Sequence, residues 1–79
     1  MAATLEKVVN IIANQLGSDA STITPETDIQ NDLGADSLDI AEMLITFEEE
    51  FNISIDESEA LEIKTVGDVV KHIDAKISG

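Results

Sequence analysis

Apolar residues recur at helical spacing in the first part of the chain. They are Leu5, Val8, Val9, Ile12 and Leu16. Separations of three and four residues place such side chains on one face of a helix. Gly17 follows as a stop signal, and Thr4 is suited to cap the start. The pattern predicts a first helix that ends at about residue 16.

A second helix is predicted from about Ser37 to Phe51. Its expected apolar stripe is Leu38, Ala41, Leu44, Ile45 and Phe51, with Met43 and Phe47 nearby. Asp36 is a good N-cap, and Asp39 suits the first turn because a negative charge is favourable at the positive end of the helix dipole. This helix therefore has a well-marked start.

The last third of the chain predicts three shorter elements. Residues 52–55 alternate like a short extended segment, and residues 57–63 form a brief helix carried by Ala60, Leu61 and Ile63. Thr65 to Asp68 is a capping-box pattern, which opens a last helix. That helix bears Val66, Val69, Val70, Ile73 and Ile77.

Residues 18–36 are polar and hold the single proline, so we expect a long ordered loop. Ile23, Ile29 and Leu33 are expected to pin it to the core. Long loops in compact domains are uncommon and often functional. The predicted fold class is all-α: one domain, residues 1–79, forming a small four-helix bundle. It has three main helices, one short helix and a long loop between helices 1 and 2.

Charge narrows the range of partners. The net charge is −13, and fourteen acids but no basic residue lie between Lys7 and Lys64. Nucleic acid and anionic membrane surfaces are unlikely partners because both need Lys and Arg. A basic protein surface is the expected partner, and long-range attraction would speed the encounter. A merely acidic protein without such a partner is the alternative.

Other features of composition bear on location. No apolar stretch approaches membrane-spanning length, and the first residues lack a basic segment followed by an apolar run. The 79 residues include no cysteine, so the chain has neither a disulfide framework nor a thiol of its own. We expect a cytoplasmic monomer.

The segment from Asp32 to Asp39 reads Asp-Leu-Gly-Ala-Asp-Ser-Leu-Asp. It places Ser37 at the junction of a loop and a helix, where a hydroxyl is exposed and open to modification by another protein. A phosphoester there would lie near free backbone N–H groups. The neighbouring aspartates would repel it, which suits them to a partner's basic groups or metal ion. The alternative is that Ser37 is an ordinary helix-start residue.

These residues resemble the acyl carrier protein family. Its signature is Asp-Ser-Leu at the head of the second helix, matched here by Asp36, Ser37 and Leu38. The wider resemblance covers essentially the whole chain. It includes Asp32 to Ala35, Asp39, Glu42, Glu48 to Phe51, and Thr65 with Val66.

The resemblance implies a 4′-phosphopantetheine arm on Ser37, moved there from coenzyme A by a separate transferase. The arm ends in a thiol that carries acyl groups as thioesters, so the chain would catalyse nothing itself. The implied partners are that transferase and basic surfaces of fatty acid synthesis enzymes, met through Asp39, Glu42 and Glu48. Acyl chains are expected to lie against Met43, Ile45, Ile55, Ala60, Leu61 and Ile63.

Some residues depart from the family pattern. Asp56 stands where a proline is common, and Ile40 with Ala41 where Thr-Val is common. These departures leave open a specialised carrier of polyketide, aminoacyl or D-alanyl groups. A serine hydrolase is disfavoured because the single histidine, His72, has no evident orienting partner and no G-x-S-x-G motif occurs. A calcium module is disfavoured because the EF-hand pattern is missing, and no specific metal site is expected. An acidic interaction module without an arm remains an alternative.

Overall fold

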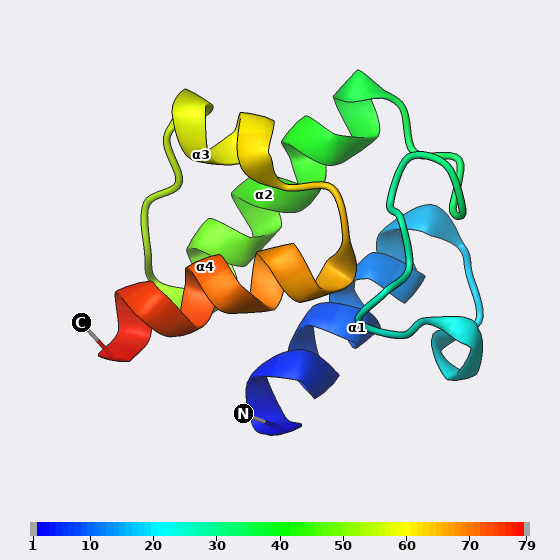
Figure 1. Ribbon diagram of the computed structural model, residues 1–79, viewed down its shortest axis with the longest axis horizontal. Helices are drawn as coiled ribbons and strands as arrows, with labels where there is room; N and C mark the ends of the chain where they lie inside the picture. Colours follow the sequence, from blue (N-terminus) through cyan, green and yellow to red (C-terminus); the bar gives the residue numbers. More distant parts are fainter. Residues whose placement is uncertain (1, 79) are drawn as a thin grey trace.

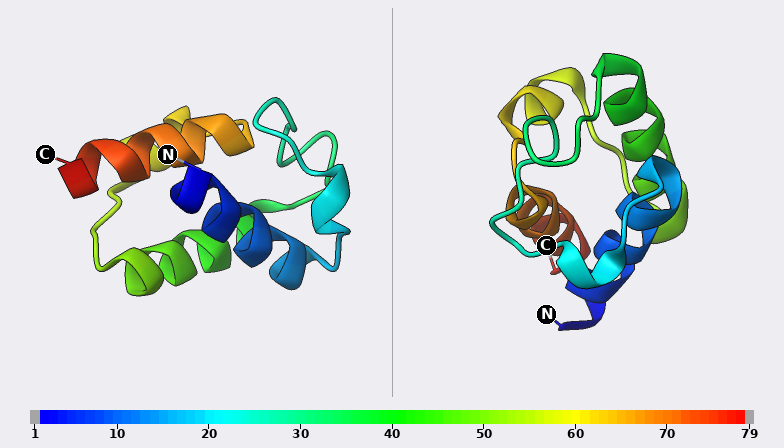
Figure 2. Two further views of the ribbon diagram at one scale, coloured as in Figure 1. Left: turned by 90° about the horizontal axis from the view of Figure 1, so that it is seen from below. Right: turned by 90° about the vertical axis from the view of Figure 1, so that its right-hand side faces the viewer.

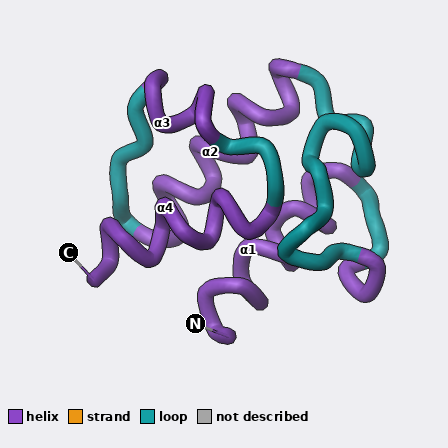
Figure 3. Tube along the Cα trace, in the orientation of Figure 1, coloured by secondary structure: helices purple, strands orange, loops and turns teal. Residues whose placement is uncertain are grey.

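All regular elements in residues 2–78, the part of the chain that the computed structural model describes, are helices (Figures 1 and 3). They are α1 (Ala2–Leu16), the 3-10 turn η1 (Ala20–Thr22), α2 (Ser37–Phe51), α3 (Glu57–Glu62) and α4 (Val66–Ser78). The predicted all-α bundle of three main helices and one short helix is confirmed.

The core lies where α1 packs closely against both α2 and α4 (Figure 2). Its buried apolar side chains are Val8, Ile12, Ile23, Ile29, Ala35, Met43, Phe47, Val66, Val69 and Ile73. Phe47 is the largest of the fully buried side chains, and it comes from the middle of α2. Removing such side chains from water is the main contribution to stability in a domain of this size.

Hydrogen bonds at the helix starts follow the sequence signals, except in α1. The Asp68 N–H donates to Thr65 Oγ1 at 3.2 Å and the Thr65 N–H donates to Asp68 Oδ2 at 3.1 Å, which confirms the predicted capping box of α4. Gly17 adopts a φ of 69° directly after α1, a left-handed conformation that glycine accepts without strain. The predicted cap at Thr4 is wrong, because α1 already begins at Ala2.

The long loop is held in place by apolar side chains that pack against the core and by backbone hydrogen bonds. Ile23 and Ile29 are buried and Leu33 is partly buried against the core, as predicted. Three backbone bonds tie the loop to the segment around the start of α4: Ile29 N–H to Lys64 O (2.9 Å), Val66 N–H to Thr27 O (3.0 Å) and Gly67 N–H to Pro25 O (2.8 Å). The loop that precedes α2 is therefore joined to the residues that follow α3.

The apolar stripe predicted for α2 is confirmed at Leu44 and Phe51 and is wrong at Leu38, Ala41 and Ile45. The core-facing side chains are Ile40, Met43, Leu44, Phe47 and Phe51. Leu38 and Ile45 are 66% and 54% exposed, and Ala41 is also exposed. Since α2 carries apolar residues on more than one face, spacing alone did not decide which face the core covers.

Two smaller expectations also need correction. Leu61 and Ile77 were expected among the apolar side chains that carry their helices, but they are 83% and 54% exposed. Both lie near a helix end, where fewer neighbours cover a side chain. The alternation predicted for residues 52–55 is confirmed, because Ile53 and Ile55 pack against the core between exposed neighbours; this segment forms no strand in the described structure.

Candidate functional site

Ser37 is the first residue of α2, and its side chain is exposed. The two flanking carboxylates bond to the backbone around it: Asp39 N–H donates to Asp36 Oδ1 at 2.9 Å, and Asp36 N–H donates to Asp39 Oδ2 at 3.2 Å. This reciprocal capping box fixes the first turn of α2. The hydroxyl is thus presented to solvent from a well-defined backbone.

The residues just before Ser37 prepare this position. Gly34 is exposed and adopts a φ of 72°, a left-handed conformation that residues other than glycine rarely adopt. Ala35 is buried, and its N–H donates to Ile29 O at 3.2 Å. The chain therefore turns sharply at Gly34, anchors at Ala35 and emerges at Ser37.

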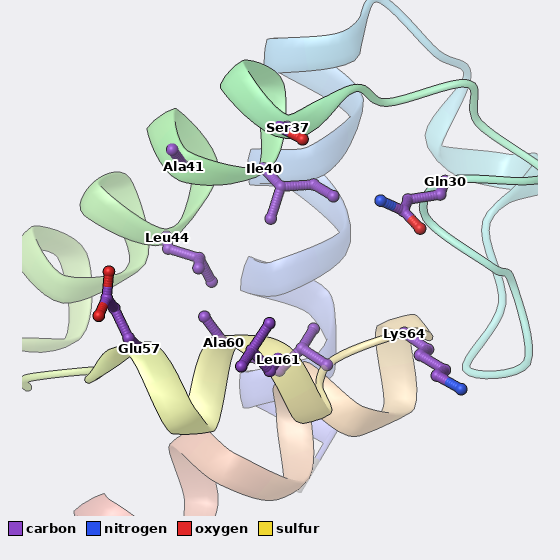
Figure 4. Close-up of a pocket in the computed structure, with 10 residues that line it drawn as sticks. Gln30, Ser37, Ile40, Ala41, Leu44, Glu57, Ala60, Leu61 and Lys64 are labelled. Atoms are coloured by element: carbon purple, nitrogen blue, oxygen red, sulfur yellow. The ribbon is translucent and has the colours of Figure 1, made fainter.

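An open groove of about 680 Å³ begins beside Ser37 (Figure 4). Its walls are α2 and α3, with one contribution from the long loop and two from the segment after α3. The lining residues are Gln30, Ser37, Ile40, Ala41, Leu44, Glu57, Ala60, Leu61, Ile63 and Lys64. The side chains along its length are mostly apolar, and the polar ones are at its ends.

The lining of the groove follows from helical geometry. Positions 37, 40, 41 and 44 share one face of α2, and positions 57, 60 and 61 share one face of α3. Figure 4 shows Ile40 and Leu44 directed toward the α3 side chains, with Ser37 near one end and Glu57 near the other. A flexible group attached at Ser37 could therefore enter an apolar space directly.

The expected acyl-lining residues fall in different places. Ala60, Leu61 and Ile63 line the groove. Met43 does not, because its side chain is 1% exposed inside the core. Ile45 lies on the exposed side of α2. Ile55 does not line the groove and packs against the core. Ile40, Ala41 and Leu44 were missed, although their spacing from Ser37 could have identified them.

The three acids expected to meet partners differ in their contacts within the fold. Glu42 is exposed on α2. Glu48 is partly buried, and one of its carboxylate oxygens accepts the Ile55 N–H at 2.7 Å. Asp39 belongs to the capping box beside Ser37. Glu42 is therefore the best of the three for testing a surface contact without disturbing the fold.

Carboxylates in the loop are also held by backbone donors. Asp28 accepts hydrogen bonds from the N–H groups of Asn31 and Gln30 at 2.9 and 3.0 Å. The Asn31 N–H is the main cause that holds the pKa of the Asp28 carboxyl below its usual value. The ionised form of Asp28 thus stabilises the turn that leads toward Ser37.

Two other kinds of site were sought in the described residues. No group of three or more His, Asp or Glu side chains in residues 2–78 is placed to hold a metal ion. None of the helices in this part of the chain combines the length and apolar character that crossing a membrane requires.

Comparison with known proteins identifies the family. The family model for the phosphopantetheine attachment site matches residues 6–73, most of the chain. An acyl carrier protein of Porphyromonas gingivalis is 46% identical over 72 residues, which cover 91% of this chain and 92% of that protein. The chain belongs to the acyl carrier protein family. The structure of an acyl carrier protein from Enterococcus faecalis aligns with a TM-score of 0.82 at 35% identity, over 95% of each chain.

The cofactor of acyl carrier proteins is 4′-phosphopantetheine, and the geometry around Ser37 fits that group. Attachment needs a hydroxyl that another protein can reach, and Ser37 is exposed at the start of α2. The small, exposed Gly34 precedes it by three residues and offers little obstruction. The groove beside Ser37 is lined mostly by apolar side chains.

Proposed function

We propose that this acyl carrier protein bears 4′-phosphopantetheine on Ser37 and delivers acyl thioesters to the enzymes of fatty acid synthesis. The observation that carries the proposal is the exposed hydroxyl of Ser37 at the end of an apolar groove. The bound group would supply a thiol, which the chain itself lacks because it has no cysteine. A cytoplasmic monomer that meets each enzyme in turn is consistent with this role.

The chain's own part in the reaction is to present and position. Ser37 Oγ would form the ester bond to the phosphorus of the phosphopantetheine group while the phosphoanhydride bond of coenzyme A breaks. Adenosine 3′,5′-bisphosphate would leave, and the hydroxyl proton would pass to a base of the transferase. Asp36 and Asp39 fix the backbone on both sides of this oxygen. Leu38, which is 66% exposed beside them, offers apolar contact surface to the approaching enzyme.

The groove between α2 and α3 is the proposed resting place of the acyl chain. Each CH₂ group moved from water into apolar surroundings contributes about 0.8 kcal/mol, so a chain of several carbons has a substantial preference for the groove. The proposed contacts are Ile40, Ala41 and Leu44 from α2 and Ala60, Leu61 and Ile63 from the opposite wall. Helical bundles commonly bind ligands between facing helices.

The decisive experiment is loading by coenzyme A and a phosphopantetheinyl transferase. Intact mass should rise by one phosphopantetheine group in the natural chain and stay unchanged in Ser37→Ala. Ser54→Ala is the matched control, because Ser54 is another exposed serine but lies in the α2–α3 linker. A mass increase that survives Ser37→Ala would overturn the assignment of the attachment site, and no increase in the natural chain would overturn the carrier function.

The same loading assay tests the acidic surface. We propose that Glu42, with Asp39 and Glu48 on the same helix, meets basic groups of the transferase. Glu42→Lys should slow loading at low ionic strength, because charge attraction speeds association. Glu6→Lys on α1 makes the same change in net charge at another exposed site. Equal rates for the two variants would show that only total charge matters and would contradict a specific role for Glu42.

A polyketide, aminoacyl or D-alanyl carrier is the competing function within the family. The attachment chemistry is the same in each case, so the mass experiment does not separate them. Transfer from the loaded protein to a fatty acid condensing enzyme does. Turnover there supports the fatty acyl role, and its absence supports a specialised carrier.

A further inference from the structure

The short helix α3 has few apolar contacts to hold it. None of its residues is buried. Among the described elements, α1 packs closely against α2 and α4, whereas α3 has no comparably close partner. Segments with few buried contacts are the ones that open most easily in native proteins. The position of α3 must therefore depend on other interactions.

The two faces of α3 have different neighbours. Glu57, Ala60 and Leu61 line the groove on one side. Glu59 and Glu62 lie three residues apart on another face, and their carboxylates meet α4. Figure 1 shows α3 along α4 on one side and near α2 on the other. α3 is thus a wall of the groove that is held from behind.

The Lys76–Glu59 ion pair makes this connection to α4, and the His72 imidazole lies beside it. Lys76 Nζ lies 2.8 Å from Glu59 Oε2 and donates to Glu59 Oε1 at 2.9 Å. The imidazole nitrogens of His72 lie 3.6 Å from Glu59 Oε2 and 3.6 Å from Glu62 Oε1. Glu59, Lys76 and His72 each expose only about a quarter of their side chains (23%, 27% and 22%), so the contacts to Glu59 are partly shielded from solvent, whereas the Glu62 side chain is 70% exposed. The Lys76 ammonium is the main cause that keeps the pKa of the Glu59 carboxyl below its usual value.

We propose that this α3–α4 ion-pair cluster (Glu59, Glu62, His72 and Lys76) sets the width of the groove and thereby the length of acyl chain that the protein shelters. The proposal rests on the carrier function proposed above. Its physical basis is that α3 has the groove on one face and charged side chains of α4 on another. Weakening the cluster allows α3 to move away from α2, which gives a longer chain more room.

Lys76→Gln is the cleanest variant for the test. It removes the cation, whereas changing Glu59 would also disturb the cap of α3, since the Glu59 side chain accepts the Asp56 N–H. Lys71→Gln is the matched control, because Lys71 is exposed on the same helix and the change in charge is identical. Lys76→Arg keeps the positive charge and should restore the natural behaviour.

The first measurement needs no cofactor. Amide hydrogen exchange at Ala60, Leu61 and Ile63 in the unmodified protein should be roughly two- to five-fold faster in Lys76→Gln, the range expected for loss of one partly exposed ion pair. Exchange within α1 should not change. Equal exchange at α3 in Lys76→Gln and Lys71→Gln would overturn the proposal.

The second measurement uses protein loaded from octanoyl- and dodecanoyl-coenzyme A. Hydroxylamine cleaves exposed thioesters faster than sheltered ones. The dodecanoyl-to-octanoyl ratio of cleavage rates should fall roughly two- to five-fold in Lys76→Gln, and Lys71→Gln and Lys76→Arg should keep the natural ratio. An unchanged ratio in Lys76→Gln would overturn the selection of chain length. Failure of every variant to accept an acyl group would instead overturn the carrier function, and with it the selection of chain length. The hydrogen-exchange data would still show whether the α3–α4 ion-pair cluster holds α3.

Discussion

At the residue scale, carboxylates in this protein act first on the backbone. Asp36 and Asp39 fix the turn that carries Ser37, and Glu48 accepts the Ile55 N–H near the end of the α2–α3 linker. Asp68 accepts the N–H groups of both Lys64 and Thr65. The acidic composition is therefore partly structural, and a charge change at these positions alters the fold as well as the surface.

Asp68 gives a prediction for pH. Its hydrogen bonds, chiefly from the Thr65 N–H, hold the pKa of its carboxyl below the usual 3.8. The folded state therefore favours the ionised form. The contribution of Asp68 to stability is fully present above the pKa that its carboxyl has in the unfolded protein. It is lost as pH falls through the lower pKa that the carboxyl has in the folded protein. Asp68→Ala should lower Tm by about 4–8 °C near neutral pH, as expected for a cap that contributes about 1 kcal/mol.

The Tm deficit of Asp68→Ala should shrink as pH falls below the usual pKa of an aspartate, and it should disappear once the natural carboxyl is protonated in the folded state as well. Thermal unfolding followed by circular dichroism at several pH values measures it. Asp74→Ala is the control, since it removes the same charge from α4 outside the cap. A deficit that is the same at both pH extremes would show that the ionised carboxylate is not what stabilises this helix start.

At the element scale, the bounds of the helices were easier to predict than their orientation. The limits of α2 and the capping box of α4 follow from local backbone chemistry, which the sequence shows directly. The core-facing side of α2 depends on where α1 and α4 lie, and apolar residues on several of its faces left the phase open. The groove could not be predicted in full for the same reason. Its second wall is placed by contacts between Glu59 and Lys76, seventeen residues apart.

The corrected face of α2 can be tested with two substitutions. Phe47→Ala removes a side chain with no exposed surface, which typically costs about 3–5 kcal/mol. A domain of this size has about 3–5 kcal/mol of stability in total, so the variant should lose most of its helical circular dichroism at room temperature. Ile45→Ala changes a side chain that is 54% exposed and should stay folded, with a loss of about 0.5 kcal/mol. Similar losses for both variants would mean that α2 is rotated from the position described here.

At the scale of the whole molecule, the net charge of −13 opposes the compact state. Four lysines offset it, and only one of them takes part in an ion pair among the described side chains. Like charges that share a small surface repel one another across the molecule. The property that attracts basic partners therefore also limits the stability of the carrier.

Salt should separate the attraction of basic partners from the self-repulsion that lowers stability. Raising ionic strength to about 0.1 M shortens the screening length to about 10 Å, which weakens repulsion between distant surface charges. We expect Tm to rise by several degrees from low salt to that concentration, while loading by the transferase becomes slower. Glu49→Lys at an exposed site of α2 should show a smaller rise in Tm, because less repulsion is left to screen. A Tm that does not depend on salt would show that self-repulsion is unimportant.

The tie between the long loop and the start of α4 gives the groove two unlike ends. The end at Ser37, Gln30 and Lys64 is framed by chain segments that the Ile29 N–H to Lys64 O bond joins. The end at Leu44 and Glu57 adjoins the linker of residues 52–56, where the Ile55 N–H to Glu48 bond is the corresponding tie. The first tie joins two backbones, whereas the second runs through the Glu48 side chain, which can change its rotamer. Movement of α3 should therefore be larger at the Glu57 end than at the Lys64 end. A longer acyl chain would therefore find extra space at its terminal carbons. The atoms nearest Ser37 would keep the same surroundings at every chain length.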